Sequence, residues 1–222
     1  MGAHRFVLVP QIAEYLGIDD AAVGERLAVL GGRRMARSER VGAGLEVLWR
    51  VTAGGLRLIA SRMTPPDFDL ARYRHEVGVV WLWVAAWQSV FGEPERVLSK
   101  REMRSLDQTS VEGGGSDGRF SVPVKCRSTV ESGALYPDVM LVFSGSRVAV
   151  HLFAWPYSSV DLNTMFSGHA RRPEAADMVL VFVDDKRVGK RVAEAAERHG
   201  VRNRVRCHLI AGQGTALPAG PG

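Results

Sequence analysis

Residues 134–153, ALYPDVMLVFSGSRVAVHLF, constrain the fold more than any other stretch of this sequence. They form two apolar runs joined by Ser144-Gly145-Ser146, a composition typical of a tight turn between two strands. Asp138 stands at the entry of the first run, and His151 lies within the second. The stretch therefore predicts a β-hairpin, and it raises the question of whether a carboxylate and an imidazole on neighbouring strands hold a metal ion.

The segments after the hairpin predict a mixed α/β sheet. The run MVLVFVDD predicts a strand, residues 189–199 predict an amphipathic helix, and VRCHLI predicts another strand. Strand, helix and strand in this order imply a crossover connection. The glycine-rich residues 111–118 predict a loop, and the low-complexity residues 212–222 predict a disordered tail.

The first 64 residues predict a smaller unit of a different kind. Residues 9–16 have apolar side chains at helical spacing, and Gly17 follows as a C-cap. Asp19 and Asp20 offer an N-cap carboxylate for a second helix that Gly31-Gly32 ends. Two short helices joined by a tight turn are the helix-turn-helix arrangement. A basic segment, a glycine turn, the strand LEVLWRV and a helix over residues 52–63 complete the pattern of a winged helix-turn-helix, although no helix is predicted before residue 9.

The prolines of Thr64-Pro65-Pro66 mark the predicted domain boundary, because they interrupt a helical pattern and a polar, acidic stretch follows. We expect a winged-helix domain at residues 1–64, a mixed α/β domain at residues 65–211 and a tail at residues 212–222. The expected fold class is thus α+β combined with α/β. A long apolar helix over residues 72–92 opens the second domain, and its tryptophans predict core packing or a dimer interface rather than a platform for bases.

The basic residues of the chain are mostly arginine. Only four of the 29 are lysine, and the net charge is +5. The rigid fork of donors on arginine suits phosphates and base edges, although codon usage in a GC-rich genome would produce the same bias. Four arginines follow the second helix, and Arg26 lies on its exposed face, where it can contact a guanine. The expected contacts to double-stranded DNA are therefore Arg26, Arg33, Arg34, Arg37 and Arg40, with little sequence specificity; the alternative is a solvated loop on a winged helix that contacts proteins.

The cysteines and the hydropathy pattern indicate the compartment. Cys126 and Cys207 are far apart and lack CxxC spacing, so the sequence supports neither a disulfide framework nor a cysteine zinc site. The most apolar stretch, residues 77–90, is interrupted by Gln88 and is too short to cross a bilayer, and residues 1–11 lack a signal-peptide pattern. We expect a cytoplasmic protein with no membrane partner.

Four short motifs resemble the replication-relaxation family of bacterial plasmids and mobile elements. They occur in the family's order, as Thr52-x-x-Gly55, a helix start at His75, SKREMR at residues 99–104 and YPDVML at residues 136–141. The resemblance implies a DNA-associated protein with an N-terminal winged helix. It also implies a C-terminal domain similar to PD-(D/E)xK nucleases.

A nuclease of that class binds Mg²⁺ through carboxylate oxygens and uses a lysine beside the attacking water. By the resemblance, Asp138 is the first ligand, and Glu102 is a candidate carboxylate from a helix. His151 stands where a Glu or Gln is expected, and Phe153 stands where the Lys is expected. Magnesium binds imidazole poorly, and Phe cannot donate a hydrogen bond. We therefore expect no catalytic residue, no metal ligand and no cofactor.

The sequence leaves three functions open. The first is a DNA-binding accessory or regulatory protein of a plasmid or integrated element, whose inactive nuclease-like domain forms a homodimer or contacts proteins of the replication or transfer machinery. The second is a Mg²⁺-dependent endonuclease that uses Asp138, Glu102 and His151. The third is a protein-interaction module that binds no DNA.

Overall fold

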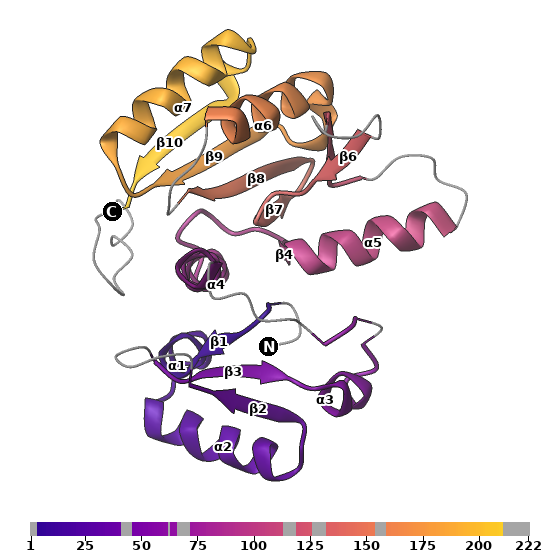
Figure 1. Ribbon diagram of the computed structural model, residues 1–222, viewed down its shortest axis with the longest axis vertical. Coiled ribbons are helices and arrows are strands. Elements are labelled where there is room, and N and C mark those ends of the chain that lie inside the picture. Colours follow the sequence, from indigo (N-terminus) through magenta and orange to yellow (C-terminus); the bar gives the residue numbers. More distant parts are fainter. Residues whose placement is uncertain are drawn as a thin grey trace. The chain divides into compact units, whose positions relative to one another are not determined.

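The computed structural model describes residues 4–40, 46–61, 63–65, 72–112, 119–125, 132–153 and 159–210. The chain divides into two compact units, Met1–Gln88 and Ser89–Gly222, and both contain helices and strands (Figure 1). This mixed content agrees with the expected α and β class. The predicted tail, the glycine turn at residues 41–44 and residues 113–118 of the predicted loop lie outside the described residues.

The first unit contains seven elements among its described residues. They are β1 (Val7–Leu8), α1 (Val9–Leu16), α2 (Asp20–Gly32), β2 (Ala36–Glu39), β3 (Leu48–Val51), α3 (Ala53–Leu58) and α4 (Tyr73–Trp87). The strands form an antiparallel sheet in the order β1-β3-β2, with Arg37 opposite Arg50. The basic segment that the sequence suggested as a loop is thus partly a strand, β2. The predicted helix over residues 52–63 is shorter, because α3 ends at Leu58.

Local signals correctly located the first two helices. Gly17 follows α1 with φ of 64°, a left-handed conformation that glycine adopts at little cost, and its N–H donates to Ala13. Asp19 is the N-cap of α2, where its carboxylate accepts a hydrogen bond of 2.8 Å from the N–H of Ala22. The two helices pack against each other, with Ala13 of α1 against Val23 and Leu27 of α2.

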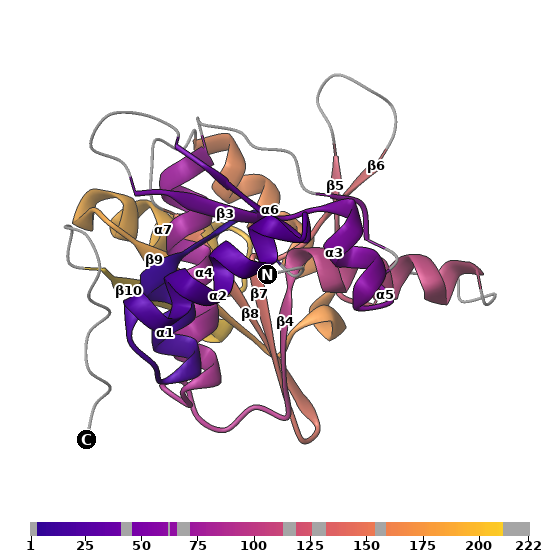
Figure 2. The same ribbon diagram turned by 90° about the horizontal axis from the view of Figure 1, so that it is seen from below.

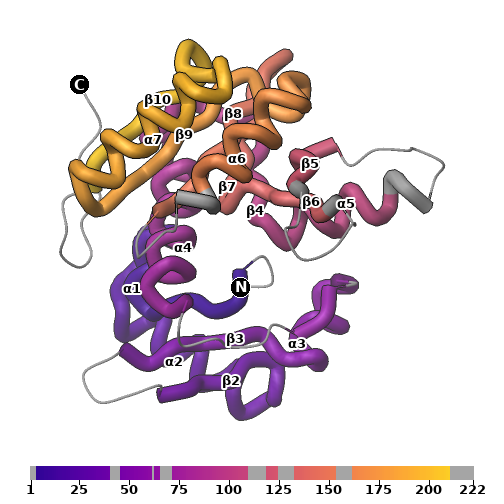
Figure 3. Tube along the Cα trace, turned by 45° about the horizontal axis from the view of Figure 1, so that its top comes forward, coloured from indigo at the N-terminus to yellow at the C-terminus, as the bar shows by residue number. Residues whose placement is uncertain are grey.

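The predicted boundary at the prolines is wrong, because α4 belongs to the first unit. Tyr73 and Val77 of α4 pack against the buried Phe6, Leu8 and Leu48, and Figure 3 shows α4 beside α1. Gln11 of α1 also donates a hydrogen bond of 2.9 Å to the carbonyl oxygen of Val77. The prolines mark a connection within this unit, since the apolar face of α4 covers its sheet. The helix ends at Trp87, earlier than the predicted residue 92.

The second unit is built on a five-stranded sheet. Its elements before the hairpin are β4 (Arg96–Ser99), α5 (Lys100–Glu112), β5 (Val122–Lys125) and β6 (Ser132–Leu135). The hairpin consists of β7 (Val139–Phe143) and β8 (Ser146–Phe153). It is followed by α6 (Ser159–Arg171), the 3-10 turn η2 (Pro173–Ala175), β9 (Met178–Val183), α7 (Lys186–Arg198), the 3-10 turn η3 (Arg202–Arg204) and β10 (Val205–Leu209).

The sheet order β10-β9-β8-β7-β4 confirms both the predicted hairpin and the predicted crossover. The strands β7 and β8 are antiparallel, with Val139 opposite Val150, and Gly145 turns between them with φ of 77°. The strands β8, β9 and β10 are parallel. The helices α6 and α7 lie side by side over the sheet (Figure 3), and β5 pairs with β6 in a separate ribbon (Figure 2).

Candidate nucleic-acid interface and candidate metal site

The turn between α2 and β2 exposes two of the predicted DNA contacts, Arg33 and Arg34. The N–H of Arg34 donates to Gly31, and the N–H of Met35 donates to Leu30, both at 2.9 Å. These two bonds form a Schellman motif, in which the residue before Met35 takes a left-handed conformation. That residue is Arg34, with φ of 56°. An arginine thus occupies a position that favours glycine.

A second segment fastens this turn. The hydroxyl of Thr52 donates a hydrogen bond of 2.6 Å to the carbonyl oxygen of Arg34, and the N–H of Thr52 donates to the carbonyl oxygen of Met35 at 3.0 Å. The same hydroxyl oxygen caps α3 by accepting from the N–H of Gly55 at 3.2 Å. A Cβ atom at Gly55 would lie 2.2 Å from the carbonyl oxygen of Met35. The Thr-x-x-Gly motif therefore holds the α2–β2 turn, a role that the sequence did not reveal.

All five predicted DNA contacts are exposed and lie on α2, on the turn or along β2. Arg26 lies on α2, and Arg33 is the C-cap residue that follows the helix, seven residues later. Arg37 lies on β2, and Arg40 follows it. In the described part of the chain, none of the five forms an ion pair. By contrast, Arg50 of β3 is buried and pairs with Glu39.

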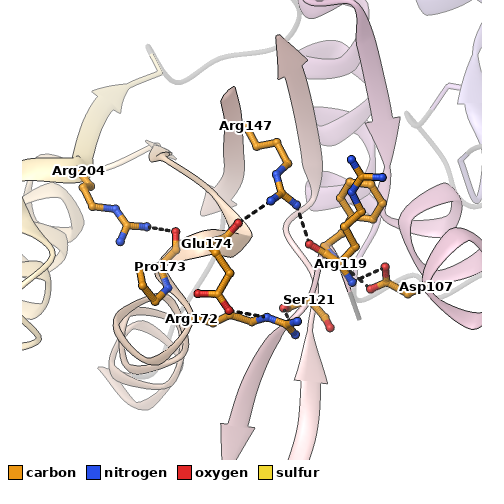
Figure 4. Close-up of polar contacts among 9 residues, drawn as sticks. Asp107, Arg119, Ser121, Arg147, Arg172, Pro173, Glu174 and Arg204 are labelled. Atoms are coloured by element: carbon orange, nitrogen blue, oxygen red, sulfur yellow. Dashed lines mark hydrogen bonds and ion pairs between the residues drawn. The ribbon is translucent and has the colours of Figure 1, made fainter. Parts of the chain in front are cut away.

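Several arginines of the second unit have a structural role instead. Figure 4 shows Arg147 donating to two carbonyl oxygens, at 2.9 Å to Arg119 and at 2.6 Å to Glu174. Arg172 forms an ion pair of 3.3 Å with the Glu174 carboxylate, and Arg204 donates to Pro173 at 3.1 Å. These guanidinium groups connect loops and turns of one unit. A high arginine content is therefore not by itself evidence of a phosphate-binding surface.

The candidate metal site begins with Asp138, which is buried at the entry of β7. Its Oδ2 accepts a hydrogen bond of 2.9 Å from the N–H of Leu152 on β8, and its N–H donates to Val150 at 3.0 Å. Its Oδ1 lies 3.8 Å from Nζ of Lys100 at the start of α5. The carboxylate thus extends the β7–β8 ladder beyond its last backbone pair.

Glu102 lies in the first turn of α5 and forms a capping box with Ser99. The Glu102 carboxylate accepts from the N–H of Ser99 at 2.8 Å, and the Ser99 hydroxyl accepts from the N–H of Glu102 at 3.3 Å. This reciprocal pair satisfies two donors that the start of a helix leaves without partners. Glu102 therefore has a structural task at the passage from β4 into α5.

His151 faces a second histidine that the sequence did not single out. Its Nε2 lies 3.1 Å from Nε2 of His169 on α6, and both side chains are buried. Burial, the neighbouring His151 and then Arg204 lower the pKa of His169 to about 3. Within the described residues, Nδ1 of His169 has no hydrogen-bond partner. A buried donor without a partner costs more than a buried acceptor, so we assign the shared proton to Nε2 of His169, with Nε2 of His151 as the acceptor.

The fold brings the three candidate ligands to neighbouring strand ends but gives each side chain another partner. Ser99, just before α5, is opposite Val139, and Val139 is opposite Val150, so Glu102, Asp138 and His151 belong to adjacent elements. Across the described residues, no group of three His, Cys, Asp or Glu side chains could hold a metal ion. Asp138 and Glu102 bond to backbone N–H groups, and His151 bonds to His169.

The comparisons with known proteins provide no relative for this chain: no family model, no curated protein and no solved structure matches it. None of the helices described is long and apolar enough to cross a membrane.

Proposed function

We propose that this chain is a DNA-binding accessory or regulatory protein of a plasmid or integrated mobile element. In this proposal the first unit is a winged helix-turn-helix that binds duplex DNA. The second unit is a nuclease-like scaffold without catalytic activity, which forms a homodimer or contacts proteins of the replication or transfer machinery. The protein acts in the cytoplasm and needs no metal cofactor.

The arrangement of the first unit supports its part of the proposal. The helices α1 and α2 are joined by a three-residue turn, and the antiparallel strands β2 and β3 follow as a wing would. In a winged helix the second helix of the turn enters the major groove and the wing contacts the backbone. The five exposed arginines lie on α2, in the turn that follows it, on β2 and directly after β2.

The observation that carries the proposal is the left-handed conformation of Arg34. A non-glycine residue in this conformation costs about 1–2 kcal/mol, and such strain clusters at functional sites. The turn keeps an exposed cation there, beside Arg33, where glycine would be more stable. Phosphate binding provides a reason for keeping it.

The contacts of the candidate metal ligands support the proposal for the second unit. Asp138 and Glu102 satisfy backbone donors, and His151 is paired with His169. Phe153 on β8 is buried and has no group that could orient water. By the resemblance, Asp138 matches the first ligand of a nuclease core, whereas His151 and Phe153 lack the chemistry expected at the next two positions.

The test is duplex-DNA binding by fluorescence anisotropy at two salt concentrations, with Mg²⁺ present and the DNA run on a gel afterwards. The variant carries Arg33→Ala, Arg34→Ala and Arg37→Ala. The matched control carries Lys186→Ala, Arg187→Ala and Arg191→Ala, which remove the same charge from exposed positions on α7.

We expect salt-sensitive binding that the first variant loses and the control keeps, with the DNA intact. An equal loss in both variants would mean that only net charge matters. No binding at low salt would favour a protein-interaction module. Cleavage with Mg²⁺ or Mn²⁺ that Asp138→Ala abolishes would favour the endonuclease.

A further inference from the structure

The strand β10 is at one edge of the five-stranded sheet and pairs on one side only, with β9 (Figure 1). In a parallel pair, alternate residues of a strand direct both their N–H and their C=O groups toward the same neighbour. The N–H of Ile210 donates to the carbonyl oxygen of Val183 on β9 at 2.7 Å, and the even-numbered residues of β10 face β9 in the same way. The N–H and C=O groups of Cys207 and Leu209 therefore face the open edge.

These outward groups are accessible to another chain. Cys207 is exposed, and Leu209 is 45% exposed. Among the residues that the structure describes, no other segment forms a hydrogen bond with their N–H or C=O groups. An exposed strand edge of this kind is a template for a further extended segment.

Two guanidinium groups lie at the start of this edge. Nη1 of Arg202 and Nη1 of Arg206 donate to the same carbonyl oxygen, that of Val205, at 3.3 Å and 3.2 Å. Val205 is an odd-numbered residue of β10, so its carbonyl group also faces the open edge. Arg206 donates to the carbonyl oxygen of Asn203 as well, at 3.1 Å. Neither arginine forms an ion pair within the described ranges, so two cations lie together here without a carboxylate.

The charges favour one kind of occupant over a second copy of this chain. Two copies paired through β10 would add a second Arg202 and a second Arg206 to an edge whose cations already lack a counter-ion. Like charges on paired strands are destabilising, and charged side chains on an edge strand protect against pairing of identical edges. A carboxylate on the incoming segment would instead form charge-assisted hydrogen bonds with both guanidinium groups.

We infer that the edge of β10 binds an extended, acidic segment of a partner protein as a sixth strand of the sheet. The outward groups of Cys207 and Leu209 form the ladder, and a carboxylate of the segment pairs with Arg202 and Arg206 beside Val205. In strand addition the main-chain bonds provide affinity and the side chains provide specificity. The inference deepens the part of the proposed function in which the second unit contacts proteins; it rests on that part and not on DNA binding.

The test uses the full chain and a fluorescein-labelled peptide, Glu-Thr-Val-Thr-Val-Thr-Glu, as the probe, with binding measured by fluorescence anisotropy. One comparison peptide carries N-methyl groups on its three central residues, so it keeps the charges and loses the central N–H donors. The other has Gln in place of both Glu residues.

Two pairs of protein variants separate the ladder from the charges. Leu209→Pro removes an outward N–H at a position where an edge strand tolerates proline, and Leu209→Ala is its control because it keeps that N–H. Arg202→Gln combined with Arg206→Gln removes both cations. The matched control, Arg187→Gln combined with Arg191→Gln, removes the same charge from exposed positions in the first half of α7.

We expect one equivalent of the probe to bind the wild type and the N-methylated peptide not to bind. Loss of the two arginines, or of the two Glu residues of the peptide, weakens binding about fivefold. Leu209→Pro weakens it about fivefold to tenfold, as the loss of one hydrogen bond does, and both control variants change it less than about twofold. If Leu209→Pro does not fold, the peptides and the arginine variants decide.

The inference is overturned if the N-methylated peptide binds as well as the probe, or if the arginine variant and its control bind equally. Sedimentation velocity without peptide gives the oligomeric state. A dimer that Leu209→Pro dissociates and Leu209→Ala keeps would make a second copy the occupant and would also overturn it.

Anisotropy with duplex DNA separates this inference from the rest of the proposed function. Probe binding by a protein that binds no DNA would support the inference and refute the role proposed for the first unit. DNA binding without probe binding would overturn the inference alone.

Discussion

The hydroxyl of Thr52 donates a hydrogen bond of 2.6 Å to the carbonyl oxygen of Arg34, 18 residues earlier in the chain. This bond joins the start of α3 to the turn after α2, and Gly55 allows the close approach because it has no Cβ atom. The exposed arginines of the turn are thus held by a motif outside the helix-turn-helix. Changes at Thr52 or Gly55 should therefore affect the geometry of the proposed DNA-binding surface.

Arg34→Gly should stabilise the protein and weaken its binding to DNA. Glycine adopts the left-handed conformation at little cost, so the free energy of unfolding should rise by about 1 kcal/mol. Removing one phosphate contact should lower duplex affinity and reduce the slope of its salt dependence by about one. Urea denaturation and fluorescence anisotropy measure the two effects. Arg34→Ala is the control, because it removes the same charge and keeps the strained backbone; equal stability of the two variants would contradict the explanation.

Gly55→Ala should destabilise the first unit. The new Cβ atom would meet the carbonyl oxygen of Met35 at 2.2 Å, so the backbone must shift and the bonds of Thr52 must weaken. We expect a loss of about 2 kcal/mol or more, measured by urea denaturation. The control is Gly24→Ala in α2, where no atom lies within 4 Å of the new Cβ. Alanine favours the helix there by about 0.5–1 kcal/mol, and a similar gain at Gly55 would show that the contact is not tight.

Stability should fall in acid because of His169. In the unfolded chain His169 binds a proton below its ordinary pKa of 6.5, whereas in the folded protein its pKa is about 3. The free energy of unfolding therefore has its full value above pH 6.5 and falls as the pH is lowered toward 3. Proton binding by His169 in the unfolded chain lowers it by up to about 1.4 kcal/mol per pH unit. Urea denaturation at several pH values should show a shallower slope in His169→Gln. The exposed His208→Gln should keep the wild-type slope; a wild-type slope in His169→Gln would count against this assignment.

Glu102 should behave as a helix cap. Glu102→Gln keeps an acceptor that suits a capping box, whereas Glu102→Ala removes it and should cost about 0.5–2 kcal/mol of stability. Urea denaturation compares the two variants. If Glu102 were a metal ligand, the pattern would differ. The neutral amide of Glu102→Gln would then lose most of the stabilisation that the carboxylate provides in the presence of Mg²⁺.

Asp138→Ala should lower stability and leave DNA binding unchanged. The substitution leaves the N–H of Leu152 buried without its acceptor, which costs about 1–3 kcal/mol. Urea denaturation and anisotropy measure stability and binding. Asp184→Ala, at an exposed position after β9, is the control and should change neither property. Loss of DNA binding in the Asp138 variant, with the fold intact, would assign this carboxylate a role that its contacts do not suggest.

Local features of this protein could be predicted from the sequence. The β7–β8 hairpin and the Gly17 and Asp19 caps depend on residues within a few positions of one another. Turn and cap chemistry of this kind is determined locally, so these predictions were confirmed. The crossover from β9 through α7 to β10 was predictable for the same reason.

Only the tertiary structure decided which distant segments meet. It assigned α4 to the first unit, turned part of the basic segment into β2, and placed His169 against His151. It also gave Asp138 and Glu102 their backbone partners, the N–H groups of Leu152 and Ser99. A sequence pattern shows that a side chain is apolar, basic or acidic, but its partner depends on contacts between segments far apart in the chain. Those contacts determine how each side chain is held, because a polar group buried in the core is nearly always hydrogen-bonded to a neighbouring segment.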